Sequence, residues 1–168
     1  GGLAAAVAAG RMELRVTVLD ERAQVGGQYF KPLASSQRFI DQRKTDAQFR
    51  AGAALELEAR TIGVKIESNA TVWGAFSANE IGALVGDRAV VYRPKRLVLA
   101  PGAFERPVPI PGWTMPGVMT TGALQTLARA YRVSPGQKVL VAGNGPLNLQ
   151  LAVELIAGGA TVVAVVET

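Results

Sequence analysis

The chain has 168 residues, of which 49% are hydrophobic and 18% charged, and its formal net charge is +5. It contains neither cysteine nor histidine, which excludes disulfides, Cys/His zinc sites and histidine-based acid–base catalysis within it. No apolar run reaches the roughly 18 residues of a membrane span, and the scattered basic residues lack the stripe with interleaved aromatics that binds nucleic acids.

The N-terminal segment predicts the second half of a Rossmann βαβ unit. Residues 1–10 are alanine-rich and favour a helix that ends at Gly10, and residues 15–21 favour a strand with acidic residues at its end. Helix, strand and terminal acid follow one another in this unit, with Gly2 as the third glycine of G-x-G-x-x-G. The first strand would precede Gly1, so we interpret the chain as an internal fragment of a longer protein. A helix followed by an unrelated strand explains the pattern equally well.

Two acidic residues and a glycine pair follow this strand. Asp20 and Glu21 are candidates to bind the adenosine ribose, because a carboxylate offers paired acceptors to two vicinal hydroxyls. Solvated acids at a strand end are the alternative. Gly26 and Gly27, followed by Gln28, allow positive φ and a close approach of the backbone to a ligand. A bare turn would explain the glycines equally well.

The middle of the chain predicts a helix and a set of strands. Residues 46–62 favour an amphipathic helix with Thr45 or Asp46 as N-cap. Its apolar face is expected at spacings of i, i+4 and i+8: Phe49, Ala53 and Leu57. The predicted strands cover residues 64–67, 71–76, 81–85 and 89–92. The last two are expected to form a hairpin around Gly86-Asp87.

A further apolar segment leads into a proline-rich linker. Residues 97–100 predict a strand that is covered on both faces, as in a parallel sheet. Pro101 and Gly102 end it, and Gly102 lets the backbone pass close to a neighbour. Prolines and glycines at 107–117 exclude regular structure for about ten residues. This stretch is therefore expected to join two nucleotide-binding units.

The C-terminal part predicts a nearly complete βαβ unit. A helix over 120–131, capped by Thr120 or Thr121, is expected to precede it. The unit itself consists of a strand over 138–143, a helix over 146–157 and a strand over 161–167.

The turn of this unit has the features of a phosphate site. Gly143 and Gly145 precede a helix that begins with Pro146, so free N–H groups and the positive helix end can face a ligand. Asn148 stands at the third glycine position, where its side chain is expected to push helix and strand apart or to shift the helix. Glu167 favours a ribose 2′-hydroxyl over a 2′-phosphate, so NAD or another adenine nucleotide is expected rather than NADP. An empty or purely structural site is the alternative.

A resemblance to a known family becomes specific in the linker. Residues 97–117 and the following Val118, with Gly-Ala-Phe-Glu-Arg-Pro at 102–107, resemble the strand, turn and linker of two-dinucleotide-binding-domain flavoproteins of the pyridine nucleotide-disulphide oxidoreductase type. The sequence of this stretch is most similar to that of the FAD subunits of hydrogen cyanide synthase, opine oxidase and related amine or proline dehydrogenases. Gly-Gly-Gln-Tyr at 26–29 matches the loop that runs along the FAD pyrophosphate and flavin in this branch. Pro101 replaces the usual threonine, so any hydroxyl contact there is lost.

The resemblance covers nearly the whole chain and implies its fold and cofactors. It implies an α/β, Rossmann-like FAD/NAD(P)-binding fold with a small β-meander. Residues 1–118 would form a partial FAD-binding domain without its first strand, and residues 119–168 the start of a second dinucleotide-binding domain. Asp20 is preferred over Glu21 for the ribose because it lies six positions before the glycine pair. The other expected cofactor-binding residues are Gly2, Gly26, Gly27, Gln28, Val72 (through its backbone to adenine), Gly102, Gly143, Gly145, Pro146 and Glu167.

The resemblance also implies a function. It suggests the flavin subunit of an amine, opine or amino-acid dehydrogenase, whose substrate passes a hydride to FAD and leaves as an imine, with partner subunits and a cytoplasmic location. No residue is a convincing catalytic acid or base, and no metal site is expected. One alternative is an NAD(P)H-dependent flavoprotein reductase similar to thioredoxin reductase, and another is a non-catalytic nucleotide-binding structural subunit. The absence of a cysteine pair after Gly27 argues against disulphide reductases of the lipoamide dehydrogenase type.

Overall fold

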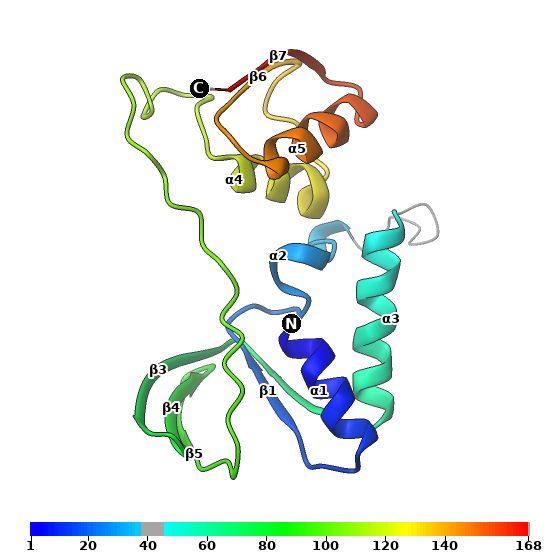
Figure 1. Cartoon of the computed structure of the whole chain (residues 1–168), viewed down its shortest axis with the longest axis vertical. Helices are drawn as coiled ribbons and strands as arrows, with labels where there is room; N and C mark the ends of the chain where they lie inside the picture. The colour runs from blue at the N-terminus through cyan, green and yellow to red at the C-terminus, as the bar shows by residue number, and fades with distance from the viewer. Residues whose placement is uncertain (38–45, 168) are drawn as a thin grey trace. The chain divides into compact units, whose positions relative to one another are not determined.

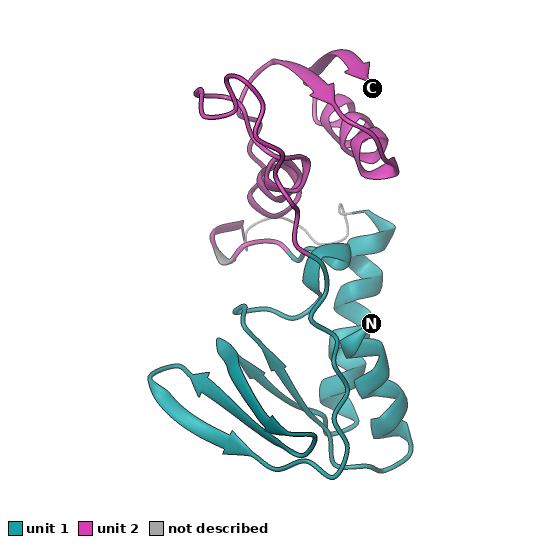
Figure 2. Cartoon of the chain, turned by 60° about the vertical axis from the view of Figure 1, so that its left-hand side comes forward, with its two compact units in different colours: residues 1–32, 42–103 teal, residues 33–41, 104–168 magenta. Residues whose placement is uncertain are grey.

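The computed structural model describes residues 1–37 and 46–167. The chain divides into two compact units (Figure 2): unit 1 comprises Gly1–Pro32 and Gln42–Ala103, and unit 2 comprises Leu33–Asp41 and Phe104–Thr168. Within the described ranges, no helix has both the length and the apolar character needed to cross a membrane.

Unit 1 combines helices, a parallel strand pair and an antiparallel meander (Figure 1). Its elements are α1 (Gly2–Arg11), β1 (Thr17–Asp20), α2 (Gly27–Phe30), α3 (Ala47–Thr61), β2 (Lys65–Ser68), β3 (Ala70–Ser77), β4 (Glu80–Val85) and β5 (Arg88–Tyr92). β1 pairs with β2 in parallel, and β3, β4 and β5 form the meander in that order. The predicted helix–strand half-unit and the hairpin are therefore confirmed. Of the two candidate caps of α3, Asp46 accepts a hydrogen bond from the Phe49 N–H at 2.7 Å, and Thr45 lies outside the described residues.

The core of unit 1 lies where α1 packs against α3. Its buried residues are Leu3, Ala6, Val7, Val25, Ala59 and Val64. Gly10 also belongs to this contact, because a Cβ there would lie 2.9 Å from the Ile62 side chain. The prediction that Gly10 ends the helix was wrong: α1 runs on to Arg11, and Gly10 serves helix packing instead.

The predicted apolar face of α3 was only partly right. Phe49 is buried, but Ala53 is exposed and Leu57 has 67% of its surface exposed. The face that packs instead contains Gly52 and Ala59, which are both buried. The spacing rule selects apolar residues by their position alone, whereas this face also uses small residues that let a neighbouring segment come close.

The predicted strand over residues 97–100 is absent. These residues form no helix or strand, and Val98 and Leu99 are 69% and 80% exposed. An apolar strand of this kind needs neighbouring strands and covered faces. In the described part of the chain, the parallel strands β1 and β2 pair only with each other, so the segment has no partner there. Gly102 has φ +74°, but nothing lies within 4 Å of a Cβ built on it, so the expected close approach is not observed.

Unit 2 contains the predicted strand–helix–strand pattern (Figure 1). Its elements are η1 (Ser35–Gln37), α4 (Thr121–Thr126), η3 (Leu127–Tyr131), β6 (Lys138–Ala142), α5 (Pro146–Ala157) and β7 (Thr161–Val166). α4 continues into η3, which is a turn of π-helix. β6 and β7 are parallel neighbours, as a βαβ unit requires, and α5 begins at Pro146 as predicted. The apolar cluster of this unit consists of Leu124, Leu151 and Leu155.

Candidate functional site

The first candidate site lies at the C-terminal end of β1. Figure 1 shows α1 running back along β1, so the start of the helix lies at the same end as Asp20. Asp20 is half-buried, and its Oδ1 accepts a hydrogen bond from the Arg22 N–H at 2.9 Å. Glu21 is exposed. A Cβ on Gly2 would lie 3.1 Å from Ala100, so Gly2 marks a close approach of the backbone, as its proposed position in a glycine motif requires.

The glycine pair forms a turn that only glycine adopts without strain. Gly26 and Gly27 have φ values of +121° and +62°, in the region that disfavours L side chains. A Cβ on Gly27 would meet no atom within 4 Å, so the backbone there is open to a ligand. Val25 packs in the same cluster as Leu3 of α1, which brings the turn to the N-terminal part of that helix. Gln28 follows the turn with an exposed side chain.

Two other predicted residues belong to other segments of unit 1. Val72 belongs to β3 of the meander, where it pairs with Ala83, and its side chain is 49% exposed. The meander begins next to the end of β1, because the Asn69 N–H donates to the Arg22 carbonyl at 3.0 Å. Gly102 lies in the irregular segment before the linker.

The second candidate site is the turn between β6 and α5. Gly143 and Gly145 have φ values of +119° and +129°, and Pro146 occupies the first turn of the helix. The Gly143 N–H donates to the Val166 carbonyl at 2.9 Å, which joins the turn to the end of β7. Glu167 follows directly and is exposed. The parallel register thus brings the glycine turn and Glu167 to the same edge of the sheet, where a dinucleotide binds in this type of fold.

The Asn148 side chain is hydrogen-bonded to this turn. It is only 7% exposed, and its Nδ2 donates to the Gly143 carbonyl at 2.7 Å. Its Oδ1 accepts from Thr121 Oγ1 at 2.6 Å. Both polar atoms of the Asn148 side chain are therefore hydrogen-bonded within unit 2. The helix α5 starts at Pro146 and contacts both strands. The amide at this position thus contributes hydrogen bonds where a glycine would allow close packing, and the expected displacement of the helix stays a prediction.

The start of α4 is bound by a residue of the linker. Glu105 Oε1 accepts from the Gly122 N–H at 2.6 Å, and its Oε2 accepts from Thr120 Oγ1 at 2.5 Å. Thr120 is the N-cap of α4 and accepts from the Ala123 N–H. Together with the Thr121–Asn148 contact, these bonds link the linker to the glycine turn of unit 2. The sequence resemblance contained Glu105, but no local pattern indicated its partner.

We expect the substitution Glu105→Gln to destabilise unit 2 by about 1 kcal/mol. The amide keeps one acceptor, loses the second, and removes a negative charge from the N-terminal end of a helix. Urea denaturation of the purified protein measures this change. Glu13→Gln, an exposed acid outside unit 2, is the control, and equal midpoints for the two variants would contradict the role of Glu105.

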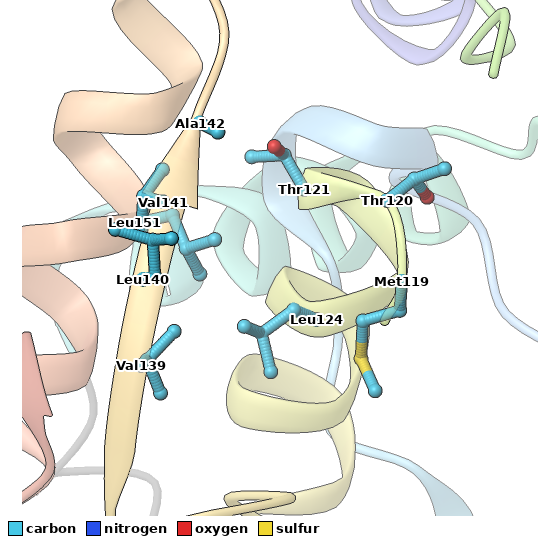
Figure 3. Close-up of a pocket in the computed structure, with 9 residues that line it drawn as sticks. All are labelled: Met119, Thr120, Thr121, Leu124, Val139, Leu140, Val141, Ala142 and Leu151. Atoms are coloured by element: carbon cyan, nitrogen blue, oxygen red, sulfur yellow. The ribbon is translucent and has the colours of Figure 1, made fainter. Parts of the chain in front are cut away.

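A small pocket lies beside the second turn (Figure 3). It has a volume of about 60 Å³ and is lined mainly by apolar side chains, among them Met119, Leu124, Val139, Val141 and Leu151. Thr120 and Thr121 also line it, but their hydroxyls already bind Glu105 and Asn148. Typical ligand pockets have about 300 Å³ or more, so this pocket is too small for a nucleotide.

Neither turn carries an evident catalytic acid or base. The hydrogen bond and the charge of Glu67 raise the pKa of Lys65, but this pair of an exposed lysine and a half-buried glutamate lies on β2. In residues 1–37 and 46–167 no group of three or more His, Cys, Asp or Glu side chains is arranged to hold a metal ion. The chemistry that these turns support is the binding of phosphate and ribose groups.

Comparisons with known proteins agree with this geometry. The family model for pyridine nucleotide-disulphide oxidoreductases matches residues 1–168. The chain is 36% identical to an opine oxidase subunit of Agrobacterium tumefaciens (strain Ach5), and the match covers 99% of this chain and 35% of that protein. It is 32% identical to hydrogen cyanide synthase subunit HcnB of Pseudomonas protegens, with 99% and 36% covered. The chain thus spans about a third of the length of these relatives.

A solved structure supports the fold independently. The crystal structure of L-proline dehydrogenase from P. horikoshii superposes with a TM-score of 0.76 at 23% identity, and the match covers 99% of this chain and 33% of that one. The expected FAD/NAD(P)-binding α/β fold is therefore confirmed.

Proposed function

The chain belongs to the pyridine nucleotide-disulphide oxidoreductase family, and on this basis we propose that it is the nucleotide-binding part of an FAD-dependent oxidoreductase. The observation that supports this most directly is the Gly26-Gly27 turn. Both residues have positive φ, and no atom lies within 4 Å of a Cβ built on Gly27. Such a turn accepts a flat or anionic ligand against the backbone, which a side chain at Gly27 would obstruct. This backbone geometry supports FAD as the ligand of the turn.

We assign each part of FAD to residues of unit 1. The Asp20 carboxylate would bind the ribose hydroxyls, and its hydrogen bond from the Arg22 N–H already fixes its orientation. Gly2 and the start of α1 would face the pyrophosphate, and the segment Gly26–Gln28 would run along the pyrophosphate and flavin. Val72 would contact adenine through its backbone. Residues 1–118 would thus form part of the FAD-binding domain.

The second turn is proposed as a site for NAD or another adenine nucleotide. Gly143, Gly145 and Pro146 would bind the phosphate at the start of α5, and Glu167 would accept from a ribose 2′-hydroxyl. The hydrogen bond from the Gly143 N–H to the Val166 carbonyl supports this arrangement, because it joins the glycine turn to the end of β7. Residues 119–168 would be the start of this second domain.

The proposed reaction is the oxidation of an amine, opine or amino-acid substrate at a C–N bond. The relatives are named as subunits of opine oxidase and hydrogen cyanide synthase, and this supports both the substrate class and the presence of partner subunits. FAD would supply the hydride acceptor: the carbon next to nitrogen would lose a hydride, the nitrogen lone pair would form the C=N bond of an iminium, and loss of the N–H proton would leave the imine. The described residues bind and orient the cofactor. The groups that contact the substrate would lie elsewhere in the full-length protein or on its partners.

The ribose assignment can be tested by substitution of Asp20 in the full-length protein. We expect Asp20→Ala to raise the Kd of FAD by about tenfold, which corresponds to about 1.4 kcal/mol, because two hydrogen bonds to a carboxylate are lost. Fluorescence titration of the apoprotein with FAD measures this change. Asp87→Ala, in the exposed turn between β4 and β5, is the control. If Glu21→Ala weakens FAD binding and Asp20→Ala does not, the ribose is bound by Glu21 and the assignment to Asp20 is wrong.

The reaction class needs a separate measurement. Anaerobic addition of an opine or secondary amine is expected to bleach the visible flavin band of the full-length enzyme. Bleaching by NADH or NADPH but by no amine would replace this proposal with the flavoprotein reductase function.

A further inference from the structure

We propose that Gly52 of α3 is a positioning residue for the FAD-binding turn, an inference that rests on the FAD site proposed above. Gly52 lies in the middle of a 15-residue helix and is buried. Glycine at such a position costs about 1 kcal/mol relative to alanine. The surrounding sequence Ala-Gly-Ala-Ala provides good helix formers on both sides. A glycine here therefore indicates that something must come close to the helix backbone.

The group that comes close is Phe30, the last residue of α2. A Cβ built on Gly52 would lie 2.6 Å from Phe30 Cβ and 2.7 Å from its Cγ. Rotation about the side-chain torsions cannot move a Cβ atom, because it is bonded directly to the backbone. A methyl group at position 52 can therefore be accommodated only if the backbone of α2 moves away from α3.

Movement of Phe30 would be transmitted to the glycine turn. A Cβ on Gly26 would lie 3.3 Å from the same Phe30 Cβ, so this atom lies between two glycines, one in the turn and one in α3. The Phe30 N–H also donates to the Gly26 carbonyl at 3.3 Å. The positive φ of Gly26 and Gly27 is thus held in a backbone that packs against α3 through Phe30.

A second contact connects the same face of α3 to this loop. Gln48 Nε2 donates to the Tyr29 carbonyl, and Gln48 lies four residues before Gly52, so both share one helix face. The Tyr29 and Phe30 rings pack edge to face with centroids 5.1 Å apart. One face of α3 therefore fixes the segment that we propose to lie along FAD, although α3 carries no recognised cofactor motif.

The test compares three variants of the full-length protein. Gly52→Ala introduces the clash, and Phe30→Ala loosens the same contact without a clash. Ala53→Gly is the matched control, because the exposed neighbour in α3 loses about 1 kcal/mol of helix propensity but does not face Phe30. For each apoprotein we would measure the Kd of FAD, the circular dichroism of bound flavin and the unfolding temperature.

We expect Gly52→Ala to raise the Kd of FAD about tenfold and Phe30→Ala about threefold or more, with an altered flavin dichroism, whereas Ala53→Gly stays within about twofold. If Gly52→Ala yields no folded protein, the Kd of FAD in Phe30→Ala, compared with that in Ala53→Gly, decides whether the inference holds. Two results would overturn the inference about Gly52 but not the proposed function. One is an unchanged FAD affinity in Phe30→Ala and Gly52→Ala. The other is a loss of FAD affinity that only parallels the fall in unfolding temperature across all three variants. A wild-type protein that binds no FAD would overturn the proposed function and this inference with it.

Discussion

Replacement of Arg129 by methionine is expected to lower the free energy of unfolding of unit 2 by about 3–5 kcal/mol. Arg129 of η3 donates from Nη1 to Glu154 Oε1 of α5 at 2.8 Å, and the two side chains are 9% and 18% exposed. The other carboxylate oxygen of Glu154 is buried and has no hydrogen-bond partner among the described residues. Loss of the guanidinium would leave a buried negative charge whose remaining donors, Gln125 and Gln150, are neutral.

Urea denaturation of the apoprotein at neutral pH measures this loss, and a double variant provides the control. Arg129→Met combined with Glu154→Met removes both charges, so it should be clearly more stable than Arg129→Met alone, because methionine fills a similar volume without a desolvation cost. Glu154→Met alone completes the comparison. If the stability losses of Arg129→Met and Glu154→Met simply add in the double variant, the two side chains are not coupled and our interpretation of the buried charge is wrong. The result matters for the second turn, since η3 and α5 are joined by this pair.

The sequence alone predicted most of the regular structure, and its failures have physical causes. The individual strands, the hairpin of β4 and β5, and α5 follow from local patterns of apolar residues, glycines and proline, so they could be found without tertiary contacts. The three-stranded meander was implied only by the family resemblance. The segment 97–100 has the composition of a buried strand, but a strand also needs a partner, and composition does not report one. In α3 the predicted face was right at Phe49 but wrong at Ala53 and Leu57, because the small residues Gly52 and Ala59 are buried instead.

The candidate site shows the same division. Glycines at tight turns and acids at strand ends were recognisable because each is required by its own backbone position. Asn148, Glu105 and Gly52 were missed as site residues because their roles depend on partners elsewhere in the chain. Thr121 lies 27 residues before Asn148, and Gly122 lies 17 residues after Glu105. A threonine pair at a helix start and a polar residue at a glycine position were the only signals, and neither specifies the contact.

Asn148→Asp is the second change with a large expected effect, at about 3 kcal/mol of lost stability in unit 2 at neutral pH. The introduced carboxylate can still accept from Thr121 Oγ1. Its second oxygen, however, would face the Gly143 carbonyl at the 2.7 Å now spanned by the amide N–H, so a hydrogen bond becomes a repulsion between two acceptors. Because the site is only 7% exposed, water cannot relieve this contact.

The pH dependence of this variant separates the electrostatic cause from a general packing defect. Burial and the facing carbonyl should raise the folded-state pKa of the new carboxyl above its unfolded value of about 3.9. Below that unfolded value the carboxyl is protonated in both states and can donate to Gly143, so the variant should approach the wild type. Its stability should then fall as the pH rises through the folded-state pKa. Asn144→Asp, with the same charge change on an exposed residue of the same turn, should show little of this dependence. If the two variants have the same stability–pH profile, the Asn148 amide does not hold the turn, and the glycine geometry of the second site must come from the backbone alone.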